Sequence, residues 1–218
     1  VACPLSFGLS YLTAIVTDFM ITHPSLTVEL DLSDRHADLV GEGLDLAVRI
    51  GQLEDSTLIA RKVADCEMQV LASPRFLDAH GRPSTPADMS EWPALFYVGS
   101  TRAGTWQYTA PDGTAGALAI TARMRANNGT VICEAAARGL GVALQPAFIS
   151  ACNVSRRELE VVLPEYQWGK VTIYTVYPQT RHLSAKARAF MDFVRDRIGS
   201  KPDWTALARE NRLAMTGS

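Results

Sequence analysis

The alternation of helix and strand in this chain is clearest at residues 134–146, which read EAAARGLGVALQP. The alanine-rich half continues a helical pattern that starts at Gly129, and the paired glycines after it are typical of a helix end followed by a turn. The apolar run VALQ comes next, and Pro146 cannot donate a hydrogen bond to a sheet. These residues predict a helix over 129–138, a tight turn, and a short strand over 142–145.

The first third of the chain shows the same alternation. Apolar side chains recur at helical spacing ahead of Pro24, at Leu9, Leu12, Val16 and Phe19. Residues 26–32 alternate apolar and polar side chains with a period of two, which predicts a half-buried strand. A short helix is predicted over 36–42, and the apolar run at 45–50, which ends at Gly51, predicts a buried strand. This order of strands and helices predicts a parallel sheet with right-handed crossovers.

A second lobe follows a change in composition. A strand is predicted over 67–72, and residues 73–93 then contain four prolines and a glycine, which suits a passage into another lobe. That lobe offers strands at 94–98 and 123–127, separated by a polar turn at 111–113. A β-rich run at 170–177 precedes a helix that Ser184 can cap.

We therefore expect an α/β chain of two Rossmann-like lobes. The last helix is expected to return to the first lobe, which makes that lobe discontinuous. Lobe I then comprises residues 1–72 and 174–200, and lobe II comprises residues 73–173. Residues 201–218 form a C-terminal tail with a possible helix at 204–213.

Composition limits the class of protein. The chain has 218 residues, of which 47% are hydrophobic and 20% charged, as in ordinary globular proteins. No apolar run is expected to reach the roughly 20 residues that cross a bilayer, because charges such as Asp18, Glu29 and Asp45 interrupt each candidate. The net charge of −2 and the pI of 6.1 do not favour DNA binding by this chain alone.

The residue types that carry catalysis or bind metals form no known pattern. The cysteines at 3, 66, 133 and 152 are widely spaced, with no CxxC pair, and we interpret them as reduced thiols of a cytoplasmic protein; a redox-sensing pair is the alternative. The histidines are scattered, and no nucleophile elbow, zinc-protease motif or phosphate-binding loop is present. Gly139 and Gly141 resemble part of a dinucleotide fingerprint, but they precede a strand instead of following one. We predict no metal, no cofactor and no enzymatic activity.

Two segments stand where small molecules bind in open parallel sheets. Ser6-Phe7-Gly8 and Asn127-Asn128-Gly129-Thr130 each connect a strand to the N-terminus of a helix. Backbone N–H groups at a helix start attract anions, so two such ends predict binding of an organic acid. The motifs leave equally open that Ser6 and Thr130 only cap their helices.

Side chains beside these segments add candidate contacts. Arg49 lies at the end of a predicted strand and can pair with a carboxylate through two hydrogen bonds. It can equally extend to solvent or pair with Asp34 or Asp45. Ser100 and Thr101 follow the strand at 94–98 and offer neutral hydrogen bonds, although such residues are often only turn formers.

Several stretches together resemble the effector-binding domain of LysR-type transcriptional regulators, over about residues 1–198. They are DLAVRIG at 45–51, followed by Leu58 and the Ala60-Arg61 step, LASPRFL at 71–77, and EAAARGLGVALQP at 134–146. The resemblance implies the periplasmic-binding-protein type 2 fold, in which two crossover strands form a hinge and an inducer binds between the lobes. The crossovers would lie near residues 70–73 and 172–177. It also implies ligand-binding positions at Ser6, Phe7, Ser33, Arg49, Ile50, Gly51, Ser100, Asn127, Gln145 and Pro146.

The resemblance further implies partners. The family's N-terminal helix-turn-helix is absent from this sequence, so DNA binding is expected only of a longer parent, and a chain that begins at Val1 is expected to be a piece of one. Family effector domains pair side by side, which makes Tyr11, Ile15 and residues 27–31 candidate surfaces of a homodimer or tetramer, with the alternative that their apolar members belong to the core. No membrane partner is expected.

Two other functions remain as alternatives. A solute-binding protein of a transport system shares the fold, and it would require export from the cytoplasm. An enzyme on a similar two-lobed fold could act on a carboxylate. The sequence leaves open the identity of the effector and the promoter that is controlled.

Overall fold

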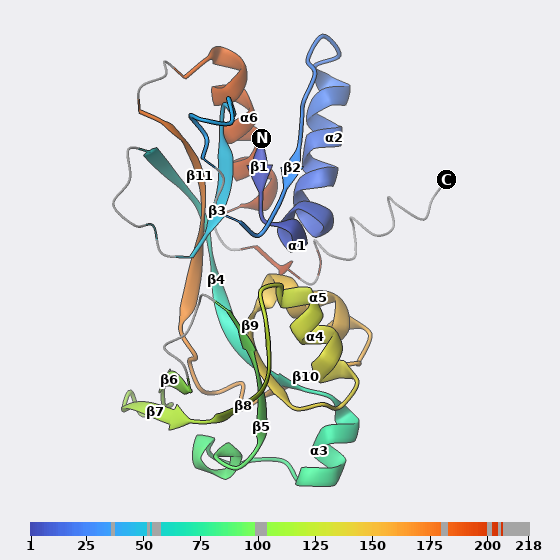
Figure 1. The fold of residues 1–218 in the computed structure, drawn as a ribbon, viewed down its shortest axis with the longest axis vertical. Helices are drawn as coiled ribbons and strands as arrows, with labels where there is room; N and C mark the ends of the chain where they lie inside the picture. The colour runs from blue at the N-terminus through green and yellow to red at the C-terminus, as the bar shows by residue number, and fades with distance from the viewer. Residues whose placement is uncertain are drawn as a thin grey trace. The chain divides into compact units, whose positions relative to one another are not determined.

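The computed structural model describes residues 1–35, 38–51, 53, 58–98, 104–179, 183–199, 202–204 and 206. The chain forms two compact units, Val1–Asp65 with Val171–Ser218, and Cys66–Lys170. It leaves the first unit within a long strand, β4 (Leu58–Ala72), and returns at the start of β11 (Lys170–Pro178) (Figure 1). The boundaries expected from the sequence lie after residues 72 and 173. The difference arises because β4 runs unbroken through the first boundary, so no strand-breaking residue marks that boundary in the sequence.

The sheet of the first unit has the strand order β2-β1-β3-β11. Strand β1 (Ala2–Cys3) pairs in parallel with β2 (Asp31–Leu32) and with β3 (Ala47–Ile50). Strand β11 pairs antiparallel with β3, with Thr175 opposite Val48. The predicted parallel sheet is confirmed for β1, β2 and β3. Their carboxyl ends consequently lie at one edge.

An unbroken helix follows β1 and is built from α1 (Leu5–Phe7), the π-helical turn η1 (Gly8–Leu12) and α2 (Thr13–Thr22). Its buried side recurs every four residues, at Phe7, Tyr11, Ile15 and Phe19. Phe19 packs edge-on against Phe190 of α6 (Ala185–Ile198), with ring centroids 5.2 Å apart. A Cβ atom on Gly8 would lie 2.4 Å from the end of the Leu32 side chain, so a larger residue here would require that side chain to move. The helix is thus fixed against both α6 and the sheet.

The same helix corrects one expectation about membranes. Leu5–Thr22 is 18 residues long and apolar enough, by length and composition alone, to cross a bilayer. The expectation that charges interrupt every such run is wrong here, because Asp18 is the single charged residue in this segment. In the structure 44% of the segment is buried inside the protein. Its aromatic side packs into the first unit, which is how a core helix of a folded domain behaves.

Two predictions for residues 26–43 are wrong. The strand expected over 26–32 is paired only at Asp31–Leu32, because its neighbour β1 is two residues long. The helix expected over 36–42 is a single turn in its described part. The Asp38 carboxylate accepts the backbone N–H groups of Val40 and Gly41 at 3.2 and 3.1 Å, and Gly43 ends the turn with a φ of 71°. An aspartate and a left-handed glycine this close leave room for one turn only.

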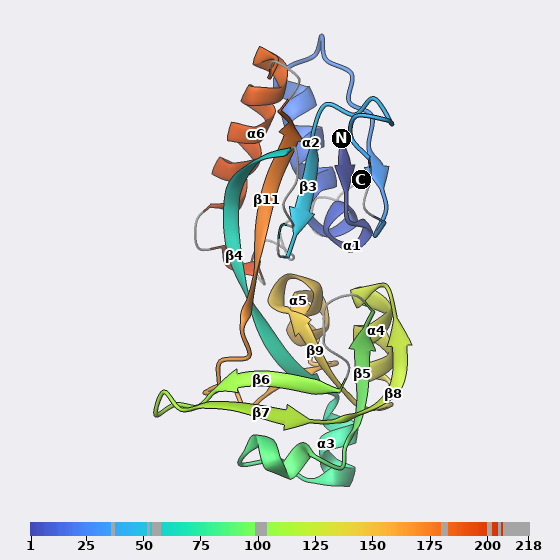
Figure 2. The ribbon, with the colours of Figure 1, turned by 60° about the vertical axis from the view of Figure 1, so that its left-hand side comes forward.

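The sheet of the second unit has the strand order β4-β9-β5-β8, and β10 (Glu160–Val162) pairs with β4. Strand β5 (Pro93–Tyr97) pairs in parallel with both β9 (Val142–Pro146) and β8 (Thr121–Ala126). Strand β4 is antiparallel to β9. Figure 2 shows the arrowheads of β5, β8 and β9 at the same edge, next to α4 (Gly129–Ala137).

Side chains of this sheet alternate between two buried faces. One face carries Leu71, Leu95 and Ala143, which belong to a core shared with α4 and α5 (Ala147–Ser155). The other carries Val70, Phe96 and Val142, in a core shared with the elements that cover this face: α3 (Pro74–His80), the 3-10 turn η2 (Pro86–Met89), and the hairpin of β6 (Thr105–Thr109) and β7 (Ala115–Ala119). Burial on both faces explains why these strands are apolar runs in the sequence.

Local signals located some of the remaining elements and missed others. The Ser184 hydroxyl accepts the N–H of Ala187 at 3.2 Å and caps α6, as predicted. Helices α3 and α5 were not predicted, because the proline before each was interpreted as a chain break. Pro74 instead occupies the first turn of α3 and Pro146 directly precedes α5, positions where the missing N–H of proline costs nothing. Of the helix expected over 204–213, Trp204 and Ala206 are helical and the other residues lie outside the described part of the chain.

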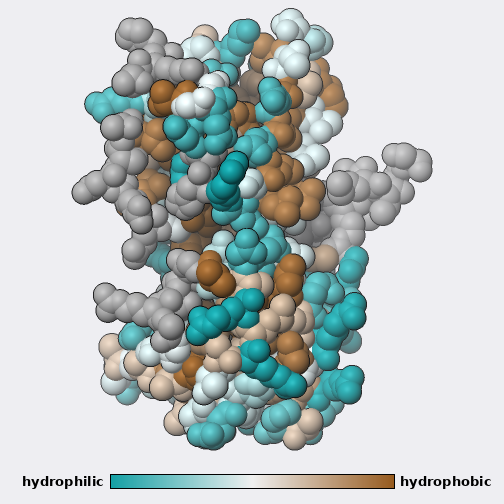
Figure 3. All heavy atoms as spheres, in the orientation of Figure 1, coloured by the Kyte–Doolittle hydropathy of each residue, from teal (hydrophilic) through white to brown (hydrophobic). Residues whose placement is uncertain are grey.

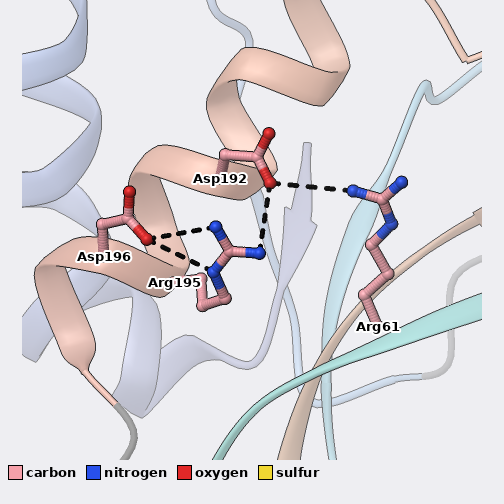
Figure 4. Close-up of polar contacts among 4 residues, drawn as sticks. All are labelled: Arg61, Asp192, Arg195 and Asp196. Atoms are coloured by element: carbon pink, nitrogen blue, oxygen red, sulfur yellow. Dashed lines mark hydrogen bonds and ion pairs between the residues drawn. The ribbon is translucent and has the colours of Figure 1, made fainter.

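A chain of ion pairs connects α6 with β4 inside the first unit (Figure 4). Asp192 of α6 lies 3.7 Å from the guanidinium of Arg61 and 3.4 Å from that of Arg195, which also contacts Asp196. These side chains are about half exposed, and pairs of this kind contribute about 0–1 kcal/mol each. The network therefore orients α6 on the strand more than it stabilises the unit.

Candidate functional site

The carboxyl edge of the second sheet gathers several of the predicted ligand-binding residues. Asn127 follows β8 and is exposed, while Gln145 and Pro146 end β9. Helix α4 begins at this edge, and its N-cap is Asn128, whose side chain accepts the N–H of Val131 at 3.2 Å. The alternative in which Thr130 caps this helix is therefore wrong. Ser100 lies outside the described residues.

Gln145 is the most unusual polar side chain at this edge. It is 2% exposed, and its amide Nε2 has no hydrogen-bond partner in the described part of the structure. Its Oε1 packs against the start of α4, since a Cβ atom on Gly129 would lie 2.7 Å from it. An unsatisfied buried amide costs about 1–3 kcal/mol. Gln145 therefore offers a strong donor to any acceptor that reaches it.

Polar neighbours continue the site onto β4. Gln69 lies directly opposite Gln145 in the antiparallel pair of β4 and β9, so both side chains project on the same face. The buried hydroxyl of Ser150, on α5, donates to Gln69 Oε1 at 3.2 Å. The sequence analysis did not identify Gln69 or Ser150. Their contact depends on strand register, for which no local pattern in the sequence gave a signal.

Exposed apolar side chains flank this polar edge. Val98, directly after β5, is 53% exposed, and its N–H donates to Ala126 O at 2.8 Å. Val131, in the first turn of α4, is also exposed. Exposed valines beside a buried, unpaired amide suit a small molecule with a polar head and an apolar body.

The carboxyl edge of the first sheet carries the other predicted positions. Ser6 and Phe7 follow β1, Ser33 follows β2, and Arg49, Ile50 and Gly51 end β3. Arg49 and Ile50 are half-buried and lie opposite Tyr174 and Ile173 of β11. The N–H of Gly51 donates to Thr172 O at 3.0 Å, with a φ of 115° that favours glycine. One sheet edge thus brings these predicted residues together.

The start of the first helix differs from the expected open loop. Ser6 and Phe7 are already helical, and the helix begins at Leu5 after Pro4, so Ser6 is not the cap. The N–H of Leu5 donates to the Asp34 carboxylate at 3.1 Å, which places a negative charge of the protein itself at this helix start. Phe7 is fully buried against Tyr11 and Trp204. Ser33 accepts the N–H of Arg35 at 3.1 Å.

The cysteines are free thiols. Cys3, Cys66 and Cys133 are buried, and Cys152 is half-buried. Burial raises the pKa of the Cys66 thiol to about 11 and that of Cys133 to about 12, and it raises the pKa of Cys3 further. Thiols of this kind are not nucleophilic at neutral pH. Among the described residues no group of His, Cys, Asp and Glu side chains is arranged to hold a metal ion.

Comparison with known sequences identifies the protein family to which this chain is similar. A family model described as the LysR substrate binding domain matches residues 1–199. An uncharacterized HTH-type transcriptional regulator of Haemophilus influenzae is 36% identical over 186 residues, which cover 85% of this chain and 64% of the relative. The HTH-type transcriptional regulator DmlR of Escherichia coli is 32% identical over 190 residues, which cover 87% and 61%. The chain therefore spans less than two thirds of the length of these relatives.

Solved structures agree with the sequence comparison. The regulatory domain of AphB from Vibrio vulnificus has 26% identity and a TM-score of 0.72, covering 90% of this chain and 96% of that one. The regulatory domain of CrgA, a LysR-type transcriptional regulator from Neisseria meningitidis, has 24% identity and a TM-score of 0.79, covering 91% and 97%. The expected type 2 periplasmic-binding-like fold is confirmed. This chain belongs to the LysR substrate-binding domain family.

Proposed function

We propose that this chain is the effector-sensing part of a LysR-type transcriptional regulator and that its effector is a small organic acid. The observation that carries the proposal is the buried, unpaired amide Nε2 of Gln145 beside the start of α4. A carboxylate accepts hydrogen bonds only, so it satisfies this donor and gains from the positive end of the helix dipole. Val98 and Val131 then contact the apolar part of the acid.

Arg49, in the first unit, is a separate candidate for binding a carboxylate. It ends β3 at the carboxyl edge of the first sheet, where Ser33 and Gly51 also lie. A guanidinium group binds a carboxylate with two parallel hydrogen bonds, and Arg keeps its charge at every physiological pH. Acid binding that favours one conformation of the domain shifts the population toward it, which is how a sensor passes a signal to the rest of its protein.

The relatives favour a regulator over the alternatives. The relatives from Haemophilus influenzae and Escherichia coli are HTH-type transcriptional regulators by name, not transport proteins or enzymes. Since they extend well beyond this chain, we propose that DNA is bound by another part of the parent protein. The net charge of −2 agrees with a domain that does not bind DNA itself. We further propose that the parent acts in the cytoplasm, without enzymatic activity.

Self-association is proposed through the exposed apolar side of the first helix. Of the two possibilities for Tyr11 and Ile15, a dimer surface or the core, the structure shows the core, since both are buried in the first unit. Leu9 and Ile21 are instead 57% and 72% exposed. Figure 3 shows apolar surface along the part of the molecule that holds α2. A homodimer or tetramer would cover it.

The effector proposal is tested by calorimetric titration of the chain with a panel of aromatic and aliphatic carboxylates. Gln145→Leu keeps the size of the side chain and removes the amide, and we expect it to weaken the best acid about tenfold, or about 1.4 kcal/mol. Gln107→Leu, an identical change at an exposed position of β6, is the control and leaves the affinity unchanged. A panel in which no acid binds, or equal losses in both variants, would contradict an acid site at this edge.

A further inference from the structure

A cavity of about 380 Å³ lies within the second unit and shares Gln69, but none of the other residues named there, with the edge described above. It is lined by Glu67, Met68 and Gln69 of β4 and by Tyr166, Gln167 and Trp168, which precede β11. Small-molecule pockets in proteins have volumes of roughly 300–1,000 Å³. The cavity is thus large enough for a compact metabolite.

Its charge differs from that of the α4 edge. Of the described residues that line the cavity, Glu67 is the only one with a charge, and Gln69 and Gln167 add neutral amides. An organic anion would be repelled by Glu67 and would meet no basic side chain in this wall. The lining therefore selects a neutral or positively charged molecule.

Aromatic rings form the apolar part of the wall. The rings of Tyr166 and Trp168 lie 6.2 Å apart with planes inclined at 36°. Tyr108, from the hairpin, contacts both rings, at centroid distances of 5.7 Å and 5.4 Å. The aromatic faces are thus held in place by neighbouring rings, and such faces attract cations.

Trp168 carries an unused donor. It is 4% exposed, and its indole Nε1 has no hydrogen-bond partner in the described part of the structure. Buried indole N–H groups normally have a partner. A ligand oxygen in the cavity would supply the missing acceptor.

We propose that this cavity binds a small organic cation that also carries an oxygen acceptor, with choline as the representative ligand. Glu67 provides the counter-charge, the faces of Tyr166 and Trp168 contact the ammonium methyl groups, and the ligand hydroxyl accepts the indole N–H of Trp168. This second site goes beyond the organic-acid site and does not depend on it. The two ligands would bind together, because they have opposite charges and contact different residues.

The test follows the indole N–H signals of the chain by ¹⁵N–¹H NMR during titration with choline. The chain has 4 Trp residues, so each indole signal can be resolved, and Trp168→Phe assigns the one at issue. We expect the Trp168 signal to shift progressively with choline. The uncharged isostere 3,3-dimethylbutan-1-ol and the anion benzoate should leave that signal in place.

A matched pair of variants isolates the contribution of the Glu67 charge to choline binding. Glu67→Gln should weaken choline binding about fivefold or more, the loss expected for one ion pair with a ligand cation. Glu165→Gln removes the same charge from an exposed position in the neighbouring turn, outside the lining, and should have no effect. The three other indole signals show whether each variant remains folded.

Three results would overturn the proposal. The first is an unmoved Trp168 signal at the highest soluble choline concentration. The second is equal binding of choline and its uncharged isostere, which would show that the cavity binds apolar groups without recognising the positive charge. The third is an equal loss in Glu67→Gln and Glu165→Gln, which would show a general field effect. None of them affects the organic-acid proposal, whose test uses Gln145.

Discussion

Thr172 Oγ1 donates a hydrogen bond to Asp65 Oδ1 at 2.8 Å, and this bond joins β11 to β4 at the residues where the chain returns to the first unit and leaves it. The other carboxylate oxygen of Asp65 pairs with Lys62 Nζ at 2.9 Å. Both strands are therefore fixed side by side next to the points where the chain leaves the first unit and returns to it. The bond is a natural point at which to measure how firmly the crossover strands are held.

Thr172→Val tests this bond. Valine keeps the β-branched shape of threonine and removes the donor, so we expect the free energy of unfolding to fall by about 1 kcal/mol, the usual value for a partly exposed hydrogen bond. Urea denaturation of the variant is the measurement. Thr121→Val, at an exposed position of β8, is the control and should change stability by no more than about 0.5 kcal/mol. Equal effects of the two variants would show that the Asp65 contact contributes nothing.

The two glycines of the Gly139-Leu140-Gly141 turn should respond differently to alanine. Gly139 has a φ of 79°, and a Cβ atom there meets nothing closer than 3.6 Å, so Gly139→Ala costs only backbone strain of about 1–2 kcal/mol. A Cβ on Gly141 would lie 2.1 Å from the backbone oxygen of Pro93, which the β5–β9 pairing holds in place. We expect Gly141→Ala to cost about 3 kcal/mol or more, or to prevent folding. Chemical denaturation ranks the two, and the reverse order would contradict this explanation of the turn.

The buried thiols should make stability fall at high pH. The pKa of Cys133 is raised by burial from 9.0 to about 12, so the unfolded chain loses this proton above pH 9 while the folded chain keeps it. The unfolded state then binds fewer protons, and stability declines by up to about 1.4 kcal/mol per pH unit for such a thiol between pH 9 and 12. Urea denaturation at pH 8, 9.5 and 10.5 measures the slope. Cys133→Ala should have a shallower slope than the unmodified chain, whereas parallel slopes would show that this thiol is not the cause.

Arg49→Ala should weaken the binding of an organic acid at the carboxyl edge of the first sheet. If Arg49 binds the carboxylate, its loss should reduce affinity about tenfold or more, with most of the change in the enthalpy of a charged hydrogen bond. Arg35→Ala removes the same charge at an exposed position after Ser33 and serves as the control. Calorimetry with an uncharged amide of the same acid should show no difference between the unmodified chain and Arg49→Ala. Equal losses in the two arginine variants would instead indicate general attraction by positive charge.

Patterns within a few residues were sufficient to locate much of the fold. The repeat of apolar side chains located the helix around Val16 and Phe19, Ser184 marked the start of α6, and the run at 142–145 became β9. Each of these signals arises within one or two turns or one strand, where local backbone preference and burial act together. The carboxyl-edge residues Asn127 and Arg49 followed from strand ends, whereas Gln145 was implied only by the resemblance to the LysR family.

The other features of the fold and of the candidate sites depended on contacts between distant parts of the chain. The helix around Tyr11 has one side buried and the other exposed, and only packing against α6 and Trp204 decided that Tyr11 lies inside and Leu9 outside. The unpaired amide of Gln145 and the unpaired indole of Trp168 are likewise visible only when their surroundings are assembled. Sequence alone therefore determined many of the helices and strands, because those preferences are local, although it missed α3 and α5 and overextended the strand at 26–32. Tertiary structure decided which polar groups are left without partners, because hydrogen bonding depends on atoms that lie far apart in the chain.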